Sequence, residues 1–155
     1  MNVIEPKDAN VSVAPGESHP YRVLRSCLDG RVSLLQFEEK VDQRGRLLPL
    51  EFHSLPFTPQ RSFLVTGVPV GTVRGRHAHR TASQILFCVS GRVDVCVRAD
   101  GKEHLFALAE ASSGLLIGPG VWAQQTYQTD GAILLVMASE PFDAGSYVQH
   151  SLDPL

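Results

Sequence analysis

The sequence has few cysteines, no long apolar run and no excess of basic charge. Its three cysteines, Cys27, Cys88 and Cys96, form no CxxC pair, and any disulfide scheme leaves at least one of them over. Free thiols are typical of a reducing compartment. The longest apolar run, 132–138, is strand-length and well short of the roughly 18 residues that a membrane helix needs. The sequence therefore predicts a cytoplasmic protein with no membrane partner.

The charge balance bears on the kind of partner. The formal net charge is -2 at pH 7, and no run of lysine and arginine offsets it. A nucleic-acid partner would require a basic surface, so we expect none.

The first 20 residues also lack the unbroken apolar core of a secretory signal. With 155 residues, 43% of them hydrophobic, the chain has the size and composition of one soluble domain.

Helical periodicity is also missing, and short strand-like segments take its place. Residues 1–20 hold three prolines and no periodic pattern, which predicts an N-terminal arm followed by a single domain over 21–155. Residues 92–98 alternate polar and apolar side chains as a half-buried strand does, and Asp100-Gly101 is a hairpin signal. Further strands are expected at 32–37, 47–52, 61–66, 85–89, 103–108, 115–117, 121–127 and 132–137. The pattern predicts an all-β sandwich or barrel.

The most informative stretch is 74–80, which reads Arg-Gly-Arg-His-Ala-His-Arg. Side chains two apart in a strand share a face, so His77 and His79 are expected to point into the same space. Imidazole titrates near neutral pH, and one ring can accept a proton while the other donates one. The three neighbouring arginines are expected to disfavour the charged imidazole and so keep one ring basic. This combination suits acid/base chemistry on an anionic substrate.

Residues downstream of the pair follow a spacing of their own. Four residues separate His79 from Gln84, and six separate Gln84 from Gly91. Further along, four residues separate Gly114 from the Pro-Gly pair at 119–120, and two more separate that pair from Ala123. These spacings resemble the two motifs of the cupin barrel. Metal-binding cupins have glutamate where this chain has Gln84 and histidine where it has Ala123.

Those two replacements bear on the choice between a metal and a metal-free site. A catalytic metal needs about three nitrogen, sulfur or carboxylate ligands, and here only two imidazoles and a neutral amide remain. We therefore expect no metal and no other cofactor. The alternative is that Asp94 or Glu103 completes a metal site.

A narrower resemblance covers roughly residues 32–150 and rests on several short blocks. They are Asp42-x-Arg44-Gly45, Arg74-Gly75-x-His77-Ala78-His79, Gln84 with Cys88 and Gly91, Gly114-Leu115-x-Ile117-Gly118-Pro119 with Trp122, and Leu135-Val136-x-Ala138-Ser139 followed by Tyr147. Together they resemble the nucleotide-diphosphate-sugar 3,4-ketoisomerases, which are small cupins of deoxysugar biosynthesis. The resemblance implies a double-stranded β-helix, also called a jelly-roll barrel. It also implies a homodimer that exchanges N-terminal strands.

The resemblance further implies a reaction. Family members convert a dTDP-4-keto-6-deoxyhexose to the 3-keto sugar without metal or cofactor. On this chain His77 would take the proton from C3, and His79 would assist transfer between the oxygens and the return of a proton to C4. A hydrogen next to a ketone is one that a positioned imidazole can remove through an enediol. Such acid/base help contributes about 10²–10⁴ in rate, so donors to the enolate oxygen are needed as well.

Substrate-binding residues are expected around the pair. Arg61 and Arg74 match family positions and could hold the diphosphate, since guanidinium pairs bidentately with phosphate oxygens. Arg76 is added on charge alone. Gln84 could bind a sugar hydroxyl or orient a histidine, and orientation is favoured. Trp122 could stack on thymine or fill the barrel mouth, and packing is favoured.

The chain departs from the family where a phenol is expected. Phe63 and Leu64 stand in place of paired tyrosines, so a group that could donate to the developing oxyanion is missing. Ser62, Thr66 or another hydroxyl would have to substitute. The departure keeps two alternatives open. One is a non-catalytic cupin that binds a nucleotide-sugar or acts as an accessory subunit. The other is a different cupin enzyme, such as a sugar epimerase or a metal-dependent lyase or oxygenase.

Overall fold

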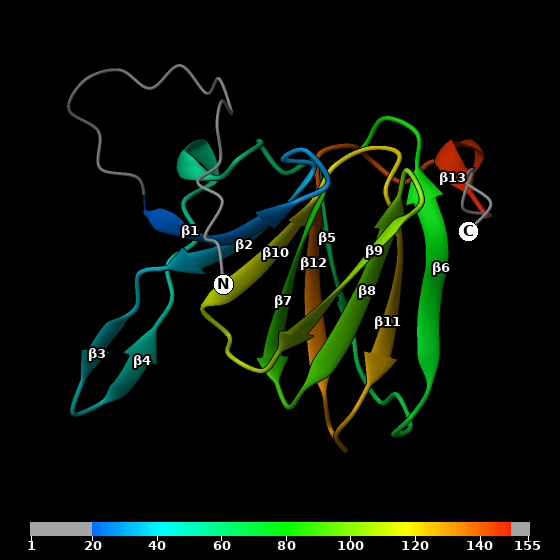
Figure 1. Cartoon of the computed structure of the whole chain (residues 1–155). Coiled ribbons are helices and arrows are strands. Elements are labelled where there is room, and N and C mark those ends of the chain that lie inside the picture. Colours follow the sequence, from blue (N-terminus) through cyan, green and yellow to red (C-terminus); the bar gives the residue numbers. More distant parts are fainter. Residues whose placement is uncertain (1–19, 150–155) are drawn as a thin grey trace, which may run out of the picture.

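Two antiparallel sheets face each other in the computed structural model, which describes residues 20–149 (Figure 1). The six-stranded sheet has the order β1-β2-β10-β7-β12-β5, and the five-stranded sheet has the order β13-β6-β11-β8-β9. The strands are β1 (Tyr21–Cys27), β2 (Val32–Phe37), β3 (Lys40–Asp42), β4 (Gly45–Leu47), β5 (Arg61–Val65), β6 (Val73–His79), β7 (Gln84–Ser90), β8 (Val93–Ala99), β9 (Lys102–Leu108), β10 (Ser113–Ile117), β11 (Trp122–Tyr127), β12 (Ile133–Ala138) and β13 (Tyr147–Val148). Two short 3₁₀ turns, η1 (Phe52–Ser54) and η2 (Ala144–Ser146), complete the described part. The expected all-β fold is confirmed.

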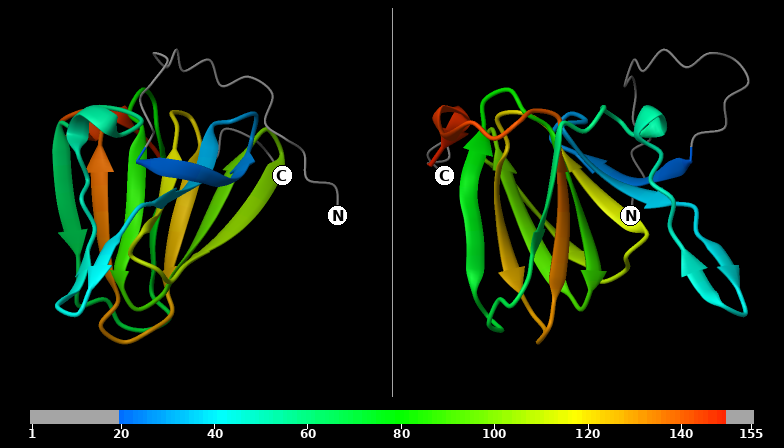
Figure 2. Two further views of the ribbon diagram at one scale, coloured as in Figure 1. Left: turned by 90° about the vertical axis from the view of Figure 1, so that its left-hand side faces the viewer. Right: turned by 180° about the vertical axis from the view of Figure 1, so that it is seen from behind.

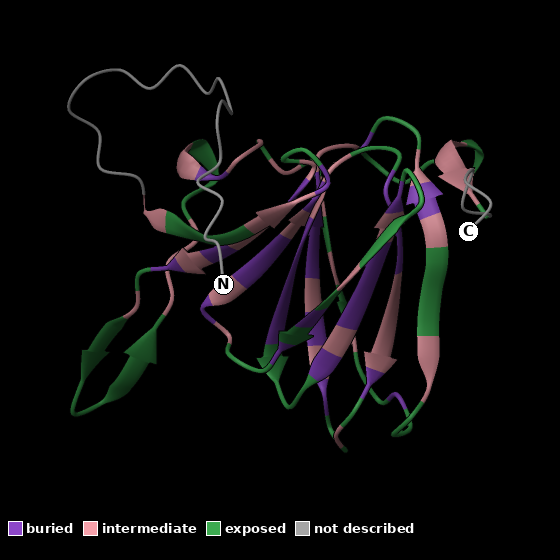
Figure 3. Ribbon diagram, viewed as in Figure 1, coloured by how far each residue is buried: buried purple, intermediate pink, exposed green. Residues whose placement is uncertain are grey.

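The main core fills the space between the two sheets. Because side chains alternate along a strand, β7 sends Leu86 and Cys88 inward, while Ile85 and Phe87 pack on the outer face of its sheet. The loop from 48 to 57 covers that outer face. Burying each large apolar side chain contributes roughly 1.5–3 kcal/mol, so the two clusters hold both faces of the six-stranded sheet. Figure 3 shows the buried strands at the centre of the barrel.

One expected strand is absent. Residues 47–52 were predicted to be extended, but β4 ends at Leu47 and 48–51 form an irregular segment before η1. Leu48 and Leu50 lie partly buried against the outer cluster, so their apolar character reflects packing of a loop and not a sheet position.

The N-terminal part of the described chain extends away from the barrel. β3 and β4 form an exposed hairpin that stands apart from the body in Figures 1 and 2. β1 lies at the edge of the six-stranded sheet, where Arg25 donates from Nη1 to the backbone oxygen of Leu105 at 2.9 Å and lies over the Phe106 ring at 4.2 Å. These contacts tie the edge of one sheet to β9 of the other. The predicted arm over residues 1–20 lies outside the described residues except for Pro20.

A β-bulge in β6 sets which side chains enter the barrel. His77 lies opposite Ala123 and Gly75 lies opposite Gln124, so Arg76 is an extra residue between the two pairs. Arg76 has φ 63° and Gly75 has φ 83°. A Cβ on Gly75 would approach the Ala123 oxygen to 3.0 Å, so glycine is required by both conformation and space.

No helix in the part that the structure describes is long and apolar enough to cross a membrane.

Candidate active site

His77 and His79 lie near the end of β6 and face the interior between the sheets. Their ring centroids are 5.0 Å apart and the rings are nearly perpendicular. Ala78 points the other way and packs with Cys96 and Trp122 on the outer face of the five-stranded sheet. The two imidazoles therefore share one space, as their spacing predicts, and both are partly buried.

A tyrosine from the C-terminal segment completes an aromatic cluster with the pair. β13 pairs with β6 so that Tyr147 lies directly opposite His79. The Tyr147 ring centroid is 4.7 Å from each histidine ring centroid. A hydrogen bond from the Arg80 amide to the Ser146 carbonyl, 3.0 Å long, holds the segment in place. Sequence reasoning did not place Tyr147 in the site, because only the return of the chain to β6 brings it there.

Arg61 places a guanidinium in the same pocket as His79. It begins β5, and its guanidinium stacks between two phenyl rings, 4.5 Å from the Phe63 centroid and 5.0 Å from that of Phe142. It forms no ion pair with any residue from 20 to 149. A partly buried guanidinium that is held by stacking and forms no ion pair is available to an anionic ligand.

The surroundings of His79 keep its imidazole neutral. Burial, followed by the charges of His77 and Arg61, lowers the pKa of His79 from 6.5 to about 4, against a smaller opposite effect of Glu140. Its Nε2 atom is buried and has no hydrogen-bond partner within the described chain. The cation that acts on this ring is thus Arg61 from a distant strand. The sequence had suggested the three arginines of 74–80, but all three are exposed.

A small pocket lies between these side chains. Its volume is about 10 Å³, roughly the space of one water molecule, so this arrangement of the side chains leaves no room for a sugar. One wall is the C-terminal segment that carries Phe142 and Tyr147. The pocket is lined by Arg61, His79, Ala82, Gln84, Ala138, Glu140, Pro141, Phe142, Asp143, Ser146 and Tyr147.

Gln84 and Arg74 also face the interior. Gln84 lies on the same face of β7 as Leu86, lines the pocket and makes no hydrogen bond to either imidazole. Arg74 lies opposite Gln125, and the bulge brings it to the same face as His77 although the two are three residues apart. Arg74 is exposed, and so is Arg76 within the bulge.

Trp122 is a predicted site residue that the structure does not bring to the pair. Ala123 lies opposite His77 and faces the interior, so Trp122, its neighbour in β11, faces outward. There its ring lies under the Arg98 guanidinium, 4.6 Å from the ring centroid, and the side chain is 8% exposed. Packing, the favoured role, agrees with this position. Stacking on a base in the same pocket as the histidines does not.

The donor set around the histidines does not fit a metal. No group of three or more His, Cys, Asp and Glu within the described residues could hold an ion. Ala123, opposite His77, offers no donor. Asp94 accepts hydrogen bonds from Arg92 and Gln128, and Glu103 pairs with Arg98 beside Trp122, so both alternatives lie on the outer face.

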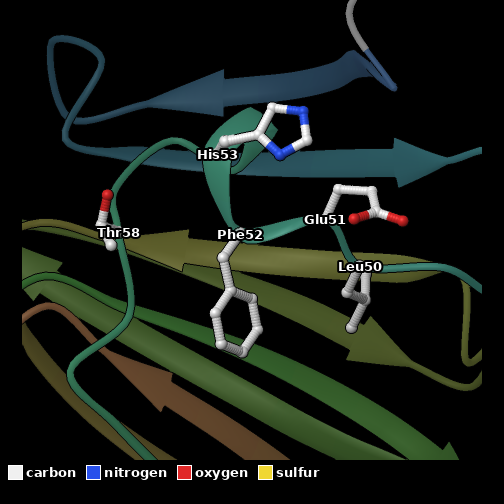
Figure 4. A pocket seen from close by; sticks show the side chains of 5 residues that line it. All are labelled: Leu50, Glu51, Phe52, His53 and Thr58. Carbon is white, nitrogen blue, oxygen red and sulfur yellow. The ribbon is translucent and has the colours of Figure 1, made fainter.

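A larger hollow lies on the far side of the six-stranded sheet (Figure 4). It is open, has a volume of about 640 Å³, and is lined by Leu50, Glu51, Phe52, His53 and Thr58. Leu50 belongs to the cluster outside the sheet, whereas the histidine pair lies inside the barrel. The hollow therefore does not share a space with the candidate catalytic residues.

Comparison with known proteins places the chain in one family. The family model of FdtA, described as WxcM-like, C-terminal, matches residues 30–153. The chain belongs to the FdtA family. A curated relative, the TDP-4-oxo-6-deoxy-alpha-D-glucose-3,4-oxoisomerase of Aneurinibacillus thermoaerophilus, is 26% identical over 117 residues, which are 75% of this chain and 84% of the relative.

Solved structures of 3,4-ketoisomerases are similar to this chain in fold and sequence. The QdtA 3,4-ketoisomerase of Thermoanaerobacterium thermosaccharolyticum was crystallised as a histidine-to-asparagine variant with TDP-4-keto-6-deoxyglucose. It is 34% identical, with a TM-score of 0.75 over 77% of this chain and 88% of that one. The WlaRB TDP-quinovose 3,4-ketoisomerase of Campylobacter jejuni is 30% identical, with a TM-score of 0.73 over 77% and 92% of the two chains. These relatives confirm the expected family, the cupin fold and the assignment to the isomerases.

Proposed function

We propose that this protein converts a TDP-linked 4-keto-6-deoxyhexose to the corresponding 3-keto sugar. The observation that supports it most strongly is the pair of inward-facing imidazoles 5.0 Å apart, beside a guanidinium without a counter-ion. A TDP-linked 4-keto sugar brings both an acidic C–H next to a ketone and the negative charge that such a site accepts. The QdtA relative was crystallised with a ligand of this chemistry.

His77 acts as the base in this scheme. It takes the proton from C3, and the electrons of that C–H bond move toward the C4 carbonyl to give an enediolate. His79 is neutral at physiological pH, because its pKa is about 4, and so can pass a proton between the two oxygens. A proton then returns to C4 as the C3 hydroxyl becomes the carbonyl. Atoms and electrons balance within the sugar, so the step needs neither an oxidant nor a reductant.

In this scheme different arginines contact the sugar end and the diphosphate end of the substrate. Arg61 lies in the pocket with His79, close enough for its charge to act on that ring, which suits contact with the sugar end or the adjoining phosphate. Arg74 and Arg76 are exposed on β6 and available to the diphosphate. Gln84 lines the pocket and is placed to hydrogen-bond a sugar hydroxyl.

Substrate binding requires the C-terminal segment to move. The pocket is too small for a hexose, and one of its walls is the segment that ends in β13. β13 is held to β6 through only two residue pairs, so few hydrogen bonds oppose its displacement.

Metal independence, a cytoplasmic location and a homodimer that exchanges N-terminal strands remain predictions. The division into an arm and one domain does as well.

Two measurements test the proposal. Incubation with TDP-4-keto-6-deoxyglucose, followed by NMR of the sugar, should show the 3-keto product. Binding of TDP without any conversion would favour the non-catalytic alternative. Elemental analysis of the purified, active protein should show no stoichiometric iron, zinc or manganese, and a metal needed for activity would overturn the acid/base scheme.

A further inference from the structure

The inner face of β5 carries no hydroxyl group. Its inward residues are Arg61, Phe63 and Val65, which alternate with exposed Ser62 and Leu64. Ser62 therefore points away from the histidines. Thr66 lies beyond the end of the strand and is exposed as well. Neither hydroxyl near Phe63 in the sequence can reach an oxyanion held between His77 and His79.

Tyr147 brings a phenol to the site from another part of the chain. Its ring lies 4.7 Å from both imidazole centroids, and its backbone pairs directly with that of His79. It also lines the pocket together with Arg61 and Gln84. No other tyrosine among residues 20–149 stacks on either histidine.

The segment that carries Tyr147 is built to place its ring. Asp143 accepts a hydrogen bond from the Gly145 amide at 2.9 Å and so caps η2, which turns the chain back toward β6. Phe142 packs against Tyr147 with centroids 5.9 Å apart and also covers Arg61. The phenol, the guanidinium and the imidazole pair thus form one connected cluster.

We propose that Tyr147 is a catalytic residue whose hydroxyl donates a hydrogen bond to the enediolate oxygen. This inference rests on the proposed isomerase function. As the C3 proton leaves, negative charge develops on O4, and a donor fixed beside the histidines stabilises it without giving up its own proton. The sequence led us to expect the phenol on β5, which lies in the six-stranded sheet. It comes instead from β13, at the edge of the five-stranded sheet. Because β13 also forms a wall of the pocket, the segment moves aside as the sugar enters, and the phenol donates once the segment has settled on the bound sugar.

Tyr147→Phe tests the proposal, because it removes the hydroxyl and keeps the ring that packs on the histidines. Losing one oxyanion donor typically lowers kcat about 10²–10³-fold, and we expect a loss of about 100-fold with KM changed less than about threefold. The rate at which product with deuterium at C4 forms in D₂O should fall in parallel. Tyr21→Phe is the matched control, since Tyr21 packs on Phe37 outside the six-stranded sheet. It should leave kcat unchanged.

The outcomes separate the two claims. A Tyr147→Phe enzyme with kcat within about threefold of the wild type would overturn the role of the hydroxyl and leave the isomerase function standing. A wild-type protein that fails to convert the keto-sugar would overturn the proposed function and this inference together. TDP affinity, measured by calorimetry on each variant, should equal that of the wild type. A Tyr147→Phe variant that loses it would show that the residue holds the nucleotide and is not the oxyanion donor.

Discussion

Replacing His79 with glutamine should remove an acid-sensitive part of the protein's stability. The pKa of His79 is about 4 in the folded protein because the ring is buried beside His77 and Arg61, against an ordinary value of 6.5. Below pH 6.5 the unfolded chain therefore binds a proton that the folded chain does not. The free energy of unfolding falls as the pH drops from 6.5 toward 4, and it levels off below that. Glutamine has no titrating group and lacks this dependence.

The size of the effect follows from the two pKa values. The full difference corresponds to an upper bound of about 3 kcal/mol. His79 is only partly buried, so solvent screening reduces the expected effect to roughly 1–2 kcal/mol. The assay is urea unfolding of the wild type and the variant at pH 7.5 and pH 4.5.

Comparing the two proteins at both pH values isolates His79, because the titration of carboxylates is common to them. The wild type should lose roughly 1–2 kcal/mol more than His79→Gln between the two conditions. His53→Gln is the matched control, since His53 lies in the outer loop, and it should behave as the wild type does. Equal losses in the wild type and His79→Gln would refute the claim that His79 is held neutral by its surroundings.

Two further substitutions test the bulge and the outer face. Arg76 has φ 63°, which costs a residue with a Cβ about 1 kcal/mol, so Arg76→Gly should be more stable than Arg76→Ala by about that amount in denaturant unfolding. Equal stabilities would show that the bulge stores no strain. Trp122→Leu should lower the free energy of unfolding by on the order of 2 kcal/mol, because a buried ring is lost, and should leave TDP affinity unchanged. A tenfold drop in TDP affinity in the folded variant would contradict the outward position of Trp122.

The strands between 84 and 137 could be predicted because their information is local. Alternation along 92–98 and the turn at Asp100-Gly101 reappear as β8, β9 and the hairpin between them. The shared face of His77 and His79 could be predicted for the same reason, because side chains two residues apart in a strand point to the same side. The apolar run 47–52 was misread because a loop that covers a sheet needs the same residue types as a strand.

The composition of the site depended on contacts between distant residues. Tyr147 reaches the histidines through the pairing of β13 with β6, which has no sequence signal near residues 77–79. Arg61 was predicted to bind substrate from its family position, but its effect on His79 depends on where β5 lies in the fold. The bulge at Arg76 also left no sign in the pattern, although it decides that Arg74 shares a face with His77. The outward position of Trp122 could have been read from the sequence. Ala123 occupies the position of an inward metal ligand in the cupin motif, so its neighbour in the strand must face out.

The fate of the C3 hydrogen tests the central claim most directly. The protein is incubated with TDP-4-keto-6-deoxyglucose in D₂O, and the sugar is followed by NMR beside the variants His77→Asn and His53→Asn. We predict 3-keto product that carries deuterium at C4 for the wild type and His53→Asn, and neither product nor deuterium uptake for His77→Asn. Product that forms at an undiminished rate in His77→Asn, or TDP-sugar that binds to the wild type without exchange, would contradict it.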